Sequence, residues 1–279
     1  AGIRIVDNFD SNINKKNDKI YKILELSTKW FQDNLETSKD CKRYLNKRNL
    51  SNETIKYFKL GFSSNSNQTL YQFLKEQNFE DKELLESNVV KLDKNNKIRD
   101  FFYNRLMFPI TNEYGKIVGF GGRVLDNSNP KYINSPESDF FKKRNILYNL
   151  YNAKQTIRSK KNMLICEGYM DVISLYDKKI KTAVAPLGTS LTESHLILSW
   201  KYVSKPTLMF DGDSSGLKAS FKSAVMSLPY LTPSKLLQFI ILPNQYDPDT
   251  YINEFSLNEF AKYLKLSLIH ISEPTRRTP

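Results

Sequence analysis

The second half of the sequence alternates short apolar runs with longer amphipathic ones, and this rhythm is the strongest constraint on the fold. It predicts strands at residues 163–166, 182–185, 207–210 and 236–242, and helices at residues 170–176, 190–199 and 217–228. Short strands that alternate with helices are typical of an open, mainly parallel sheet with helices on its faces. We therefore predict that this half of the chain is an α/β domain.

The first half has a different pattern, in which helices come before strands. Residues 1–17 are polar and predict a linker. The expected elements after it are helices at residues 18–35, 41–48, 51–58, 71–76 and 81–87, and strands at residues 105–111 and 116–124. Ser51 is a good N-cap for the third of these helices. Together these elements predict a mixed α/β subdomain.

Acidic residues follow three of the expected strands. They are Glu167 and Asp171, Asp211 and Asp213, and Asp247 and Asp249. The carboxyl ends of parallel strands share one edge of the sheet, where ligands bind, and residues i and i+2 of an extended chain point the same way. Gathered carboxylates repel one another unless cations lie between them, so the pattern indicates magnesium, with manganese as the alternative. Any one cluster alone also fits a loop or a helix N-cap.

Composition narrows the class of protein. The two cysteines and two histidines cannot form a disulfide framework or a multi-cysteine zinc site, so a catalytic metal would need oxygen ligands. The net charge of +12 suits a polyanionic partner, although the Lys-rich and Asn-rich composition of AT-rich genes would also produce it. There is no apolar run of about 18 residues and no secretory signal, so we expect a cytoplasmic protein without a membrane partner.

The acidic motifs resemble those of a known domain. Glu167-Gly-Tyr-Met-Asp171, Asp211-Gly-Asp213 and Asp247-Pro-Asp249 are similar to the Toprim domain, which primases share with topoisomerases, recombination mediators and some nucleases. Other segments are more specific and resemble DnaG-type bacterial DNA primases. They are Arg105-Leu-Met-Phe-Pro-Ile, Gly119-Phe-Gly-Gly-Arg-Val, Pro130-Lys-Tyr-Ile-Asn-Ser-Pro-Glu137 and Pro186-Leu-Gly-Thr-Ser190. The resemblance extends from about residue 20 to residue 262.

The resemblance implies a role for each site residue. Glu167 would ligate a catalytic metal or transfer a proton, and Asp171 would support it. Asp211 and Asp213 would hold two magnesium ions, and Asp247 and Asp249 would assist them. A basic side would bind the incoming nucleotide and the template through Arg105, Arg123, Lys131, Tyr132, Asn134 and Lys143. The run that contains Lys143 would also fit a solvated surface, and we expect His195 to be structural.

The resemblance also implies a division into domains. We expect a linker at 1–17, the N-terminal subdomain of a primase catalytic core at 18–159, a Toprim domain at 160–243 and the start of a helical subdomain at 244–265. Residues 266–279 resemble a translated sequencing adapter, with a natural polar tail as the alternative. The family's N-terminal zinc-binding domain and C-terminal helicase-binding domain have no counterpart in this sequence, so zinc is expected only in that missing part.

The expected function is template-directed synthesis of RNA primers on single-stranded DNA by two-metal nucleotidyl transfer. Its partners would be the template, nucleoside triphosphates, the RNA primer–DNA hybrid and, through the missing C-terminal domain, the replicative helicase. Two alternatives remain open. One is another Toprim enzyme, a topoisomerase or nuclease, and the other is a nucleic-acid-binding module without catalysis.

Overall fold

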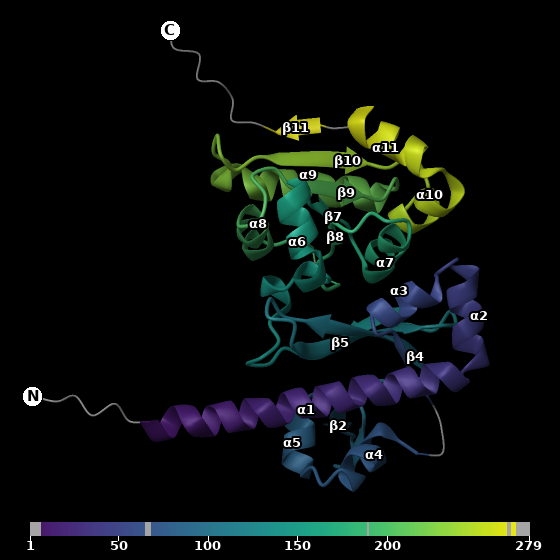
Figure 1. Ribbon diagram of the computed structural model, residues 1–279, viewed down its shortest axis with the longest axis vertical. Helices are drawn as coiled ribbons and strands as arrows, with labels where there is room; N and C mark the ends of the chain where they lie inside the picture. The colour runs from purple at the N-terminus through teal and green to yellow at the C-terminus, as the bar shows by residue number, and fades with distance from the viewer. Residues whose placement is uncertain (1–6, 65–67, 189, 267–268, 272–279) are drawn as a thin grey trace, which may run out of the picture. The chain divides into compact units, whose positions relative to one another are not determined.

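The computed structural model describes residues 7–64, 68–188, 190–266 and 269–271 and divides into two compact units (Figure 1). Unit 1 comprises residues 1–44, 59–110 and 116–136. Unit 2 comprises residues 45–58, 111–115 and 137–279. No helix of the described residues is long and apolar enough to cross a membrane.

Unit 1 is built on a four-stranded sheet with the strand order β1-β4-β5-β6. The strands are β1 (Gly61–Ser63), β4 (Arg105–Thr111), β5 (Ile117–Val124) and β6 (Tyr132–Asn134). Helix α1 (Asp7–Thr37) packs on this sheet, where Phe31 meets Phe120 edge to face at 5.2 Å between ring centroids. The expected strands on either side of residues 112–115 are confirmed, since β4 and β5 are neighbours in the sheet.

Helix α1 begins at Asp7, whereas the apolar spacing predicted a helix from Asp18. Residues 7–17 contain no proline or glycine, so nothing in the local sequence stops the helix from extending through them. The polar composition that predicted a linker is therefore compatible with a helical extension of α1.

A smaller group of elements completes unit 1. It contains α4 (Leu70–Glu76), α5 (Asp81–Glu86), and the antiparallel pair β2 (Val90–Leu92) and β3 (Ile98–Asp100). Asp100 at the end of β3 accepts hydrogen bonds from the backbone N–H groups of Leu70 and Tyr71, at 2.8 and 2.9 Å. The carboxylate thus satisfies the first donors of α4 and ties that helix to the strand pair.

Unit 2 contains the predicted parallel sheet. Its strand order is β11-β10-β9-β7-β8, and β8, β7, β9 and β10 are parallel to one another. The strands are β7 (Leu164–Ile165), β8 (Ala183–Val184), β9 (Thr207–Phe210), β10 (Leu237–Ile241) and β11 (Ile269–Ile271). The α/β class expected for this half of the chain is confirmed.

Helices α6 (Leu150–Lys160), α7 (Tyr169–Asp177), α8 (Glu193–Trp200) and α9 (Ser214–Ser227) lie around this sheet (Figure 1). Unit 2 also contains α3 (Asn52–Tyr57), α10 (Pro248–Glu254) and α11 (Leu257–Leu266), with the 3-10 turns η1 (Lys143–Asn145) and η2 (Leu228–Tyr230). Helix α2 (Lys39–Lys47) runs from unit 1 into unit 2. Helix α7 connects β7 to β8, whereas α8 and α9 connect β8 to β9 and β9 to β10, which is the opposite direction along the strand order. Because crossovers between parallel strands are right-handed, α7 lies on the opposite face of the sheet from α8 and α9.

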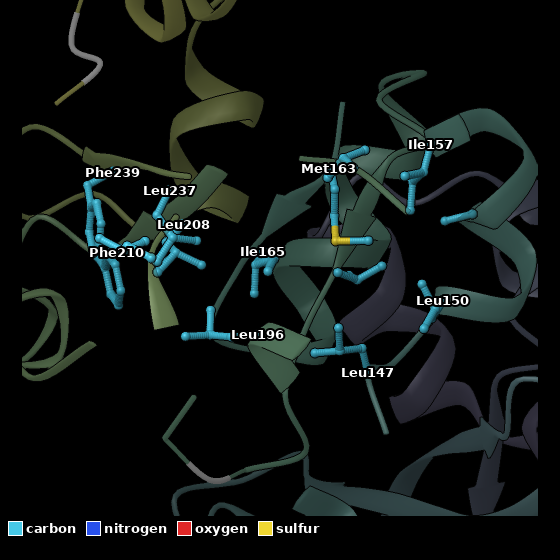
Figure 2. Close-up of a cluster of buried hydrophobic side chains, with 14 residues drawn as sticks. Leu147, Leu150, Ile157, Met163, Ile165, Leu196, Leu208, Phe210, Leu237 and Phe239 are labelled. Atoms are coloured by element: carbon cyan, nitrogen blue, oxygen red, sulfur yellow. The ribbon is translucent and has the colours of Figure 1, made fainter. Parts of the chain in front are cut away.

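One apolar core joins α6 and α8 to the sheet (Figure 2). It includes Leu150 and Ile157 of α6, Leu196 of α8, and Leu208 and Phe239 of the strands. On the other face α7 packs against α3, where the rings of Tyr57 and Tyr176 stack with centroids 4.2 Å apart. Both faces of the sheet are covered, which is usual for parallel strands.

Strand β11 lies in the segment that resembles a sequencing adapter. Residues 269–271 pair antiparallel with residues 237–239 of β10 at the edge of the sheet. A short run of Ile-His-Ile can extend an open sheet edge whatever its origin, because the pairing uses backbone groups. Residues 267–268 and 272–279 of this tail lie outside the described part of the chain.

Candidate active site

Two of the predicted acidic clusters meet at the carboxyl edge of the unit 2 sheet. Glu167 comes just after β7 and Asp211 directly after β9, and these two strands are neighbours. The backbone N–H of Asp211 donates to Glu167 Oε1 at 3.2 Å. The parallel topology thus brings together two acids that are 44 residues apart in the sequence.

The loop of Asp211-Gly-Asp213 is joined to the loop that follows β10. The N–H of Gly212 donates to the carbonyl of Tyr246 at 2.8 Å, and the N–H of Gln245 donates to the carbonyl of Gly212 at 3.1 Å. A Cβ atom at position 212 would lie 1.9 Å from the carbonyl oxygen of Pro243. Glycine is required here because the two backbones approach too closely for any side chain.

Three of the acids cap the helices that follow the strands. Asp213 Oδ1 accepts from Gly216 N at 2.7 Å in α9, and Asp247 Oδ1 accepts from Thr250 N at 2.7 Å in α10. Asp171 Oδ2 accepts from the N–H of Gly168 at 2.9 Å, at the start of α7. Each of these hydrogen bonds engages one carboxylate oxygen, so a cap and a metal ligand are compatible roles for the same side chain.

The electrostatics of this edge disfavour ionised acids. Burial, followed by the charges of Glu167, Asp247 and Asp213, raises the pKa of Asp211 from 3.8 to about 7. Burial and the charge of Asp213 raise the pKa of Glu167. Burial and the charges of Asp211, Asp247 and Asp249 raise the pKa of Asp171 well above its ordinary range. The common cause is several carboxylates close together in a partly desolvated place.

The donor set fits a hard divalent cation. Oδ1 of Asp211 is buried and has no hydrogen-bond partner among the described residues. All the candidate ligands are carboxylate oxygens, which magnesium and manganese prefer. No group of three His, Cys, Asp or Glu side chains within the described residues already has the arrangement of a metal site.

Asp249 has partners of its own. It is buried, with 1% of its surface exposed, and it forms an ion pair with Arg48 and accepts a hydrogen bond from the hydroxyl of Ser174. The expectation that Asp247 and Asp249 point the same way assumed an extended chain. Asp247 is instead the N-cap of α10 and Asp249 lies in its first turn, where residues two apart point in different directions.

Two of the predicted basic residues are buried within unit 1. Arg105 Nη1 lies within hydrogen-bonding distance of the carbonyl oxygens of Gly122, Pro130 and Lys131, at 3.3, 3.1 and 3.4 Å. It thereby links strand β5 to the segment before β6. These contacts are structural, and the role of Arg105 in binding nucleotide or template stays a prediction.

Arg123 lies between two aromatic rings of unit 1. Its guanidinium carbon is 5.1 Å from the ring centroid of Tyr44 and 5.2 Å from that of Tyr132, and Nη1 donates to the Tyr132 hydroxyl at 2.7 Å. Its buried Nε has no partner among the described residues. Cation–π contacts hold the guanidinium in one orientation.

The remaining basic and polar candidates lie in both units. Lys131 is exposed and Asn134 is half-buried, and both belong to unit 1 near or in β6. Lys143 is half-buried in turn η1 of unit 2, the unit that carries the acids. The predicted nucleotide-binding residues therefore divide between the two units.

Sequence reasoning missed Arg48 and Ser174, the partners of Asp249. Arg48 is 201 residues from Asp249, and no periodicity connects a residue after α2 to a residue in α10. Ser174 lies on an expected helix, but a serine in a helix carries no signal for its partner. Only the fold could identify these contacts.

Comparison with known proteins identifies the family. Residues 30–154 match the model for the N-terminal domain of the DNA primase catalytic core, and residues 161–234 match that for the Toprim domain. A solved DnaG primase catalytic domain bound to ssDNA is 33% identical, with a TM-score of 0.81, and the match covers 90% of this chain and 82% of that one. The chain belongs to the DnaG family of DNA primases.

Other members of the DnaG family are similar to the chain. The DNA primases of Buchnera aphidicola and Rickettsia prowazekii are 38% and 40% identical over 252 and 250 residues. Each match covers 90% of this chain but only 44% and 42% of those proteins, so the chain spans less than half of their length. A DNA primase domain from Pseudomonas aeruginosa has a TM-score of 0.83 at 33% identity, covering 90% of this chain and 79% of that one.

Proposed function

We propose that the chain is the catalytic part of an enzyme that synthesises RNA primers on single-stranded DNA. The observation that carries the proposal is the meeting of Glu167 and Asp211 at the carboxyl edge of a Toprim sheet in a chain of the DnaG family. The DNA bound to one similar catalytic domain supports a single-stranded template as the partner. The 3′-hydroxyl of the primer attacks the α-phosphate of a nucleoside triphosphate, which breaks the bond to the β-phosphate and releases pyrophosphate.

Glu167, Asp211 and Asp213 would hold divalent metal, and Asp247 would assist from the loop after β10. When bound there, magnesium or manganese lowers the pKa of the attacking hydroxyl and balances negative charge on the phosphates. Glu167 Oε1 accepts a hydrogen bond from the N–H of Asp211, which orients the carboxylate. Asp213 and Asp247 are oriented by their helix caps. The protein thus contributes fixed positions and fixed charge.

Arg123, Lys131, Tyr132, Asn134 and Lys143 would bind the phosphates of the nucleotide and the template. A triphosphate carries several negative charges, and lysine and arginine donate charge-assisted hydrogen bonds to it. The net charge of +12 supports an electrostatic contribution to template binding. We further propose that the protein works in the cytoplasm, with the replicative helicase as a partner of the whole enzyme.

The test is primer synthesis on single-stranded DNA with labelled nucleotides and magnesium. The Asp211→Ala variant should lose synthesis by more than about 100-fold, because it removes a ligand that balances charge in the transition state. Its affinity for the template should change little, since the basic residues are intact. DNA cleavage or relaxation without primer synthesis would favour another Toprim enzyme, and an unchanged activity of the variant would favour a binding module.

A further inference from the structure

Three consecutive cations lie at turn η1 of unit 2. They are Lys142, the N-cap, and Lys143 and Arg144 within the turn. Lys142 and Arg144 are exposed, and Lys143 is half-buried. The local backbone hydrogen bonds are from Asn145 N to Lys142 O at 2.9 Å and from Ile146 N to Lys143 O at 3.2 Å. A single 3-10 turn is marginal alone, so its shape depends on contacts from outside.

One of these contacts is from the N–H of Lys143 to Glu137 Oε1, at 3.1 Å, and the start of helix α8 supplies three more. His195 Nε2 lies 3.0 Å from the carbonyl oxygen of Lys143 and 3.1 Å from that of Ile146. The hydroxyl of Thr192 donates to the carbonyl of Arg144 at 3.1 Å. Three carbonyl groups of the turn therefore face α8, and two side chains hold all of them.

The hydrogen bonds of His195 define its protonation. The N–H of Thr192 donates to His195 Nδ1 at 3.2 Å, so Nδ1 has no proton and Nε2 donates to the two carbonyls. His195 is buried, with 0% of its surface exposed, and burial lowers its pKa despite the nearby carbonyls of Lys143 and Ile146. A neutral imidazole with its proton on Nε2 satisfies both nitrogens.

The contacts of turn η1 with α8 fix the backbone that carries Lys142, Lys143 and Arg144. With its carbonyls engaged by α8, the turn has a fixed backbone, from which Lys142 and Arg144 extend into solvent. A lysine on a fixed backbone loses less conformational freedom when it binds a phosphate than a lysine on a mobile loop. The effect of His195 on ligand binding would therefore be transmitted through the backbone of Lys143.

We propose that His195 is a positioning residue that holds turn η1 so that Lys143 binds a phosphate group. The proposal rests on the proposed function, in which Lys143 contacts nucleotide or template. The phosphate belongs either to the nucleoside triphosphate or to the template strand, and separate binding measurements distinguish the two sources.

Two variants of His195 form a matched pair. His195→Gln can place an amide N–H near the position of Nε2 and keep the hydrogen bonds to the turn. His195→Asn can accept from the N–H of Thr192 and keep the helix cap, but it is too short to reach the carbonyl of Lys143. Both variants remove the buried imidazole, and they differ by one methylene, so the double variant with Lys143→Ala is needed to separate the hold on the turn from the change in packing.

The experiment compares the wild-type chain, the two His195 variants, Lys143→Ala and the double variant His195→Asn/Lys143→Ala. Binding of ATP and of a single-stranded oligonucleotide is measured separately, and KM and kcat for nucleotides are measured in primer synthesis. All assays are run below the lowest unfolding temperature of the set. We expect His195→Asn to weaken binding of one phosphate ligand about tenfold, equivalent to about 1.4 kcal/mol, with kcat little changed.

His195→Gln should restore most of that affinity, and His195→Asn should have no further effect when Lys143 is already alanine. The ligand that responds identifies the source of the phosphate. Equal losses in the Asn and Gln variants, an added loss in the double variant, or no effect of Lys143→Ala on either ligand would overturn the proposal. A wild-type chain that makes no primers but shows the expected binding pattern would refute primer synthesis and leave the positioning role standing.

Discussion

Replacing Asp211 with asparagine should stabilise the metal-free protein at neutral pH. The ordinary pKa of 3.8 is raised to about 7 in the folded chain, so ionised Asp211 opposes folding. A pKa rise of this size corresponds to a loss of folding free energy of at most about 4 kcal/mol. Solvent screening of a half-buried carboxylate reduces that loss to about 1–2 kcal/mol. Asparagine keeps the shape of the side chain and removes the charge.

The sign of the pH dependence follows from the raised pKa. Below the unfolded pKa of 3.8 the carboxyl of Asp211 is protonated in both states, so its charge does not destabilise the fold. Above the folded pKa of about 7 the carboxyl is ionised in both states, and the destabilisation is complete. Urea unfolding with a chelator should therefore show the stability advantage of Asp211→Asn growing from about pH 4 to about pH 7 and staying constant above that. Saturating magnesium should stabilise the wild-type chain much more than the variant.

The exposed Asp139 of unit 2 provides the control. Asp139→Asn changes the net charge by the same amount but should show no comparable pH-dependent gain and should keep the stabilisation by magnesium. A pH-independent difference between Asp211→Asn and the wild type would refute the electrostatic reasoning. Equal stabilisation of both by magnesium would refute the role of Asp211 as a ligand.

Three further substitutions test the structure. Gly212→Ala should destabilise unit 2 by about 2–3 kcal/mol and weaken magnesium binding, because a Cβ would meet the carbonyl of Pro243. Urea unfolding measures the stability and calorimetric titration measures the magnesium affinity. Wild-type values in both assays would contradict the close approach. Arg48→Ala should cost about 3 kcal/mol because it leaves the buried carboxylate of Asp249 unpaired, and a chemical denaturation difference below about 1 kcal/mol would contradict this. Ser51→Ala should cost about 1 kcal/mol at neutral pH. Burial opposes ionisation of Asp177, but hydrogen bonds from Ser51 and Thr54 outweigh burial and lower the pKa of the carboxyl. The ionised carboxylate therefore stabilises the fold above the unfolded pKa of 3.8, and this stabilisation is lost as the pH falls through the folded pKa. The loss of unfolding free energy in Ser51→Ala, relative to the wild type, should therefore become smaller in acid. A loss that stays constant with pH would be evidence against the hydrogen bond from Ser51 to Asp177.

The sheet of unit 2 could be predicted because its strands are apolar runs separated by helices of ordinary length. The expected strand at 207–210 agrees with β9, and that at 236–242 contains β10. Short elements with weak patterns were missed, such as β6, whose three residues are all only half-buried. Helix α6 was also missed, although Leu150, Ala153 and Ile157 have helical spacing, because most of its other residues are polar.

The same reasoning located part of the candidate site. Parallel topology predicted that acids after neighbouring strands would meet, and the hydrogen bond between Glu167 and the backbone of Asp211 agrees with it. The expectation that Asp249 points the same way as Asp247 was wrong because the chain turns into α10 at that point and is no longer extended. Its ion pair with Arg48 joins distant segments, and such pairs depend on tertiary packing that local patterns do not encode.

The helix caps at the carboxyl edge restrict side-chain length as well as charge. Asp213 and Asp247 reach backbone N–H groups in the first turns of α9 and α10, and a glutamate, with one more methylene, is not among the preferred N-cap residues. Glu167 accepts from the backbone of a neighbouring strand end, where a longer reach is needed. An aspartate-to-glutamate change at 213 or 247 would therefore keep the charge but weaken a helix. Aspartate at 213 and 247 therefore suits both the helix that it begins and the cation that it would bind.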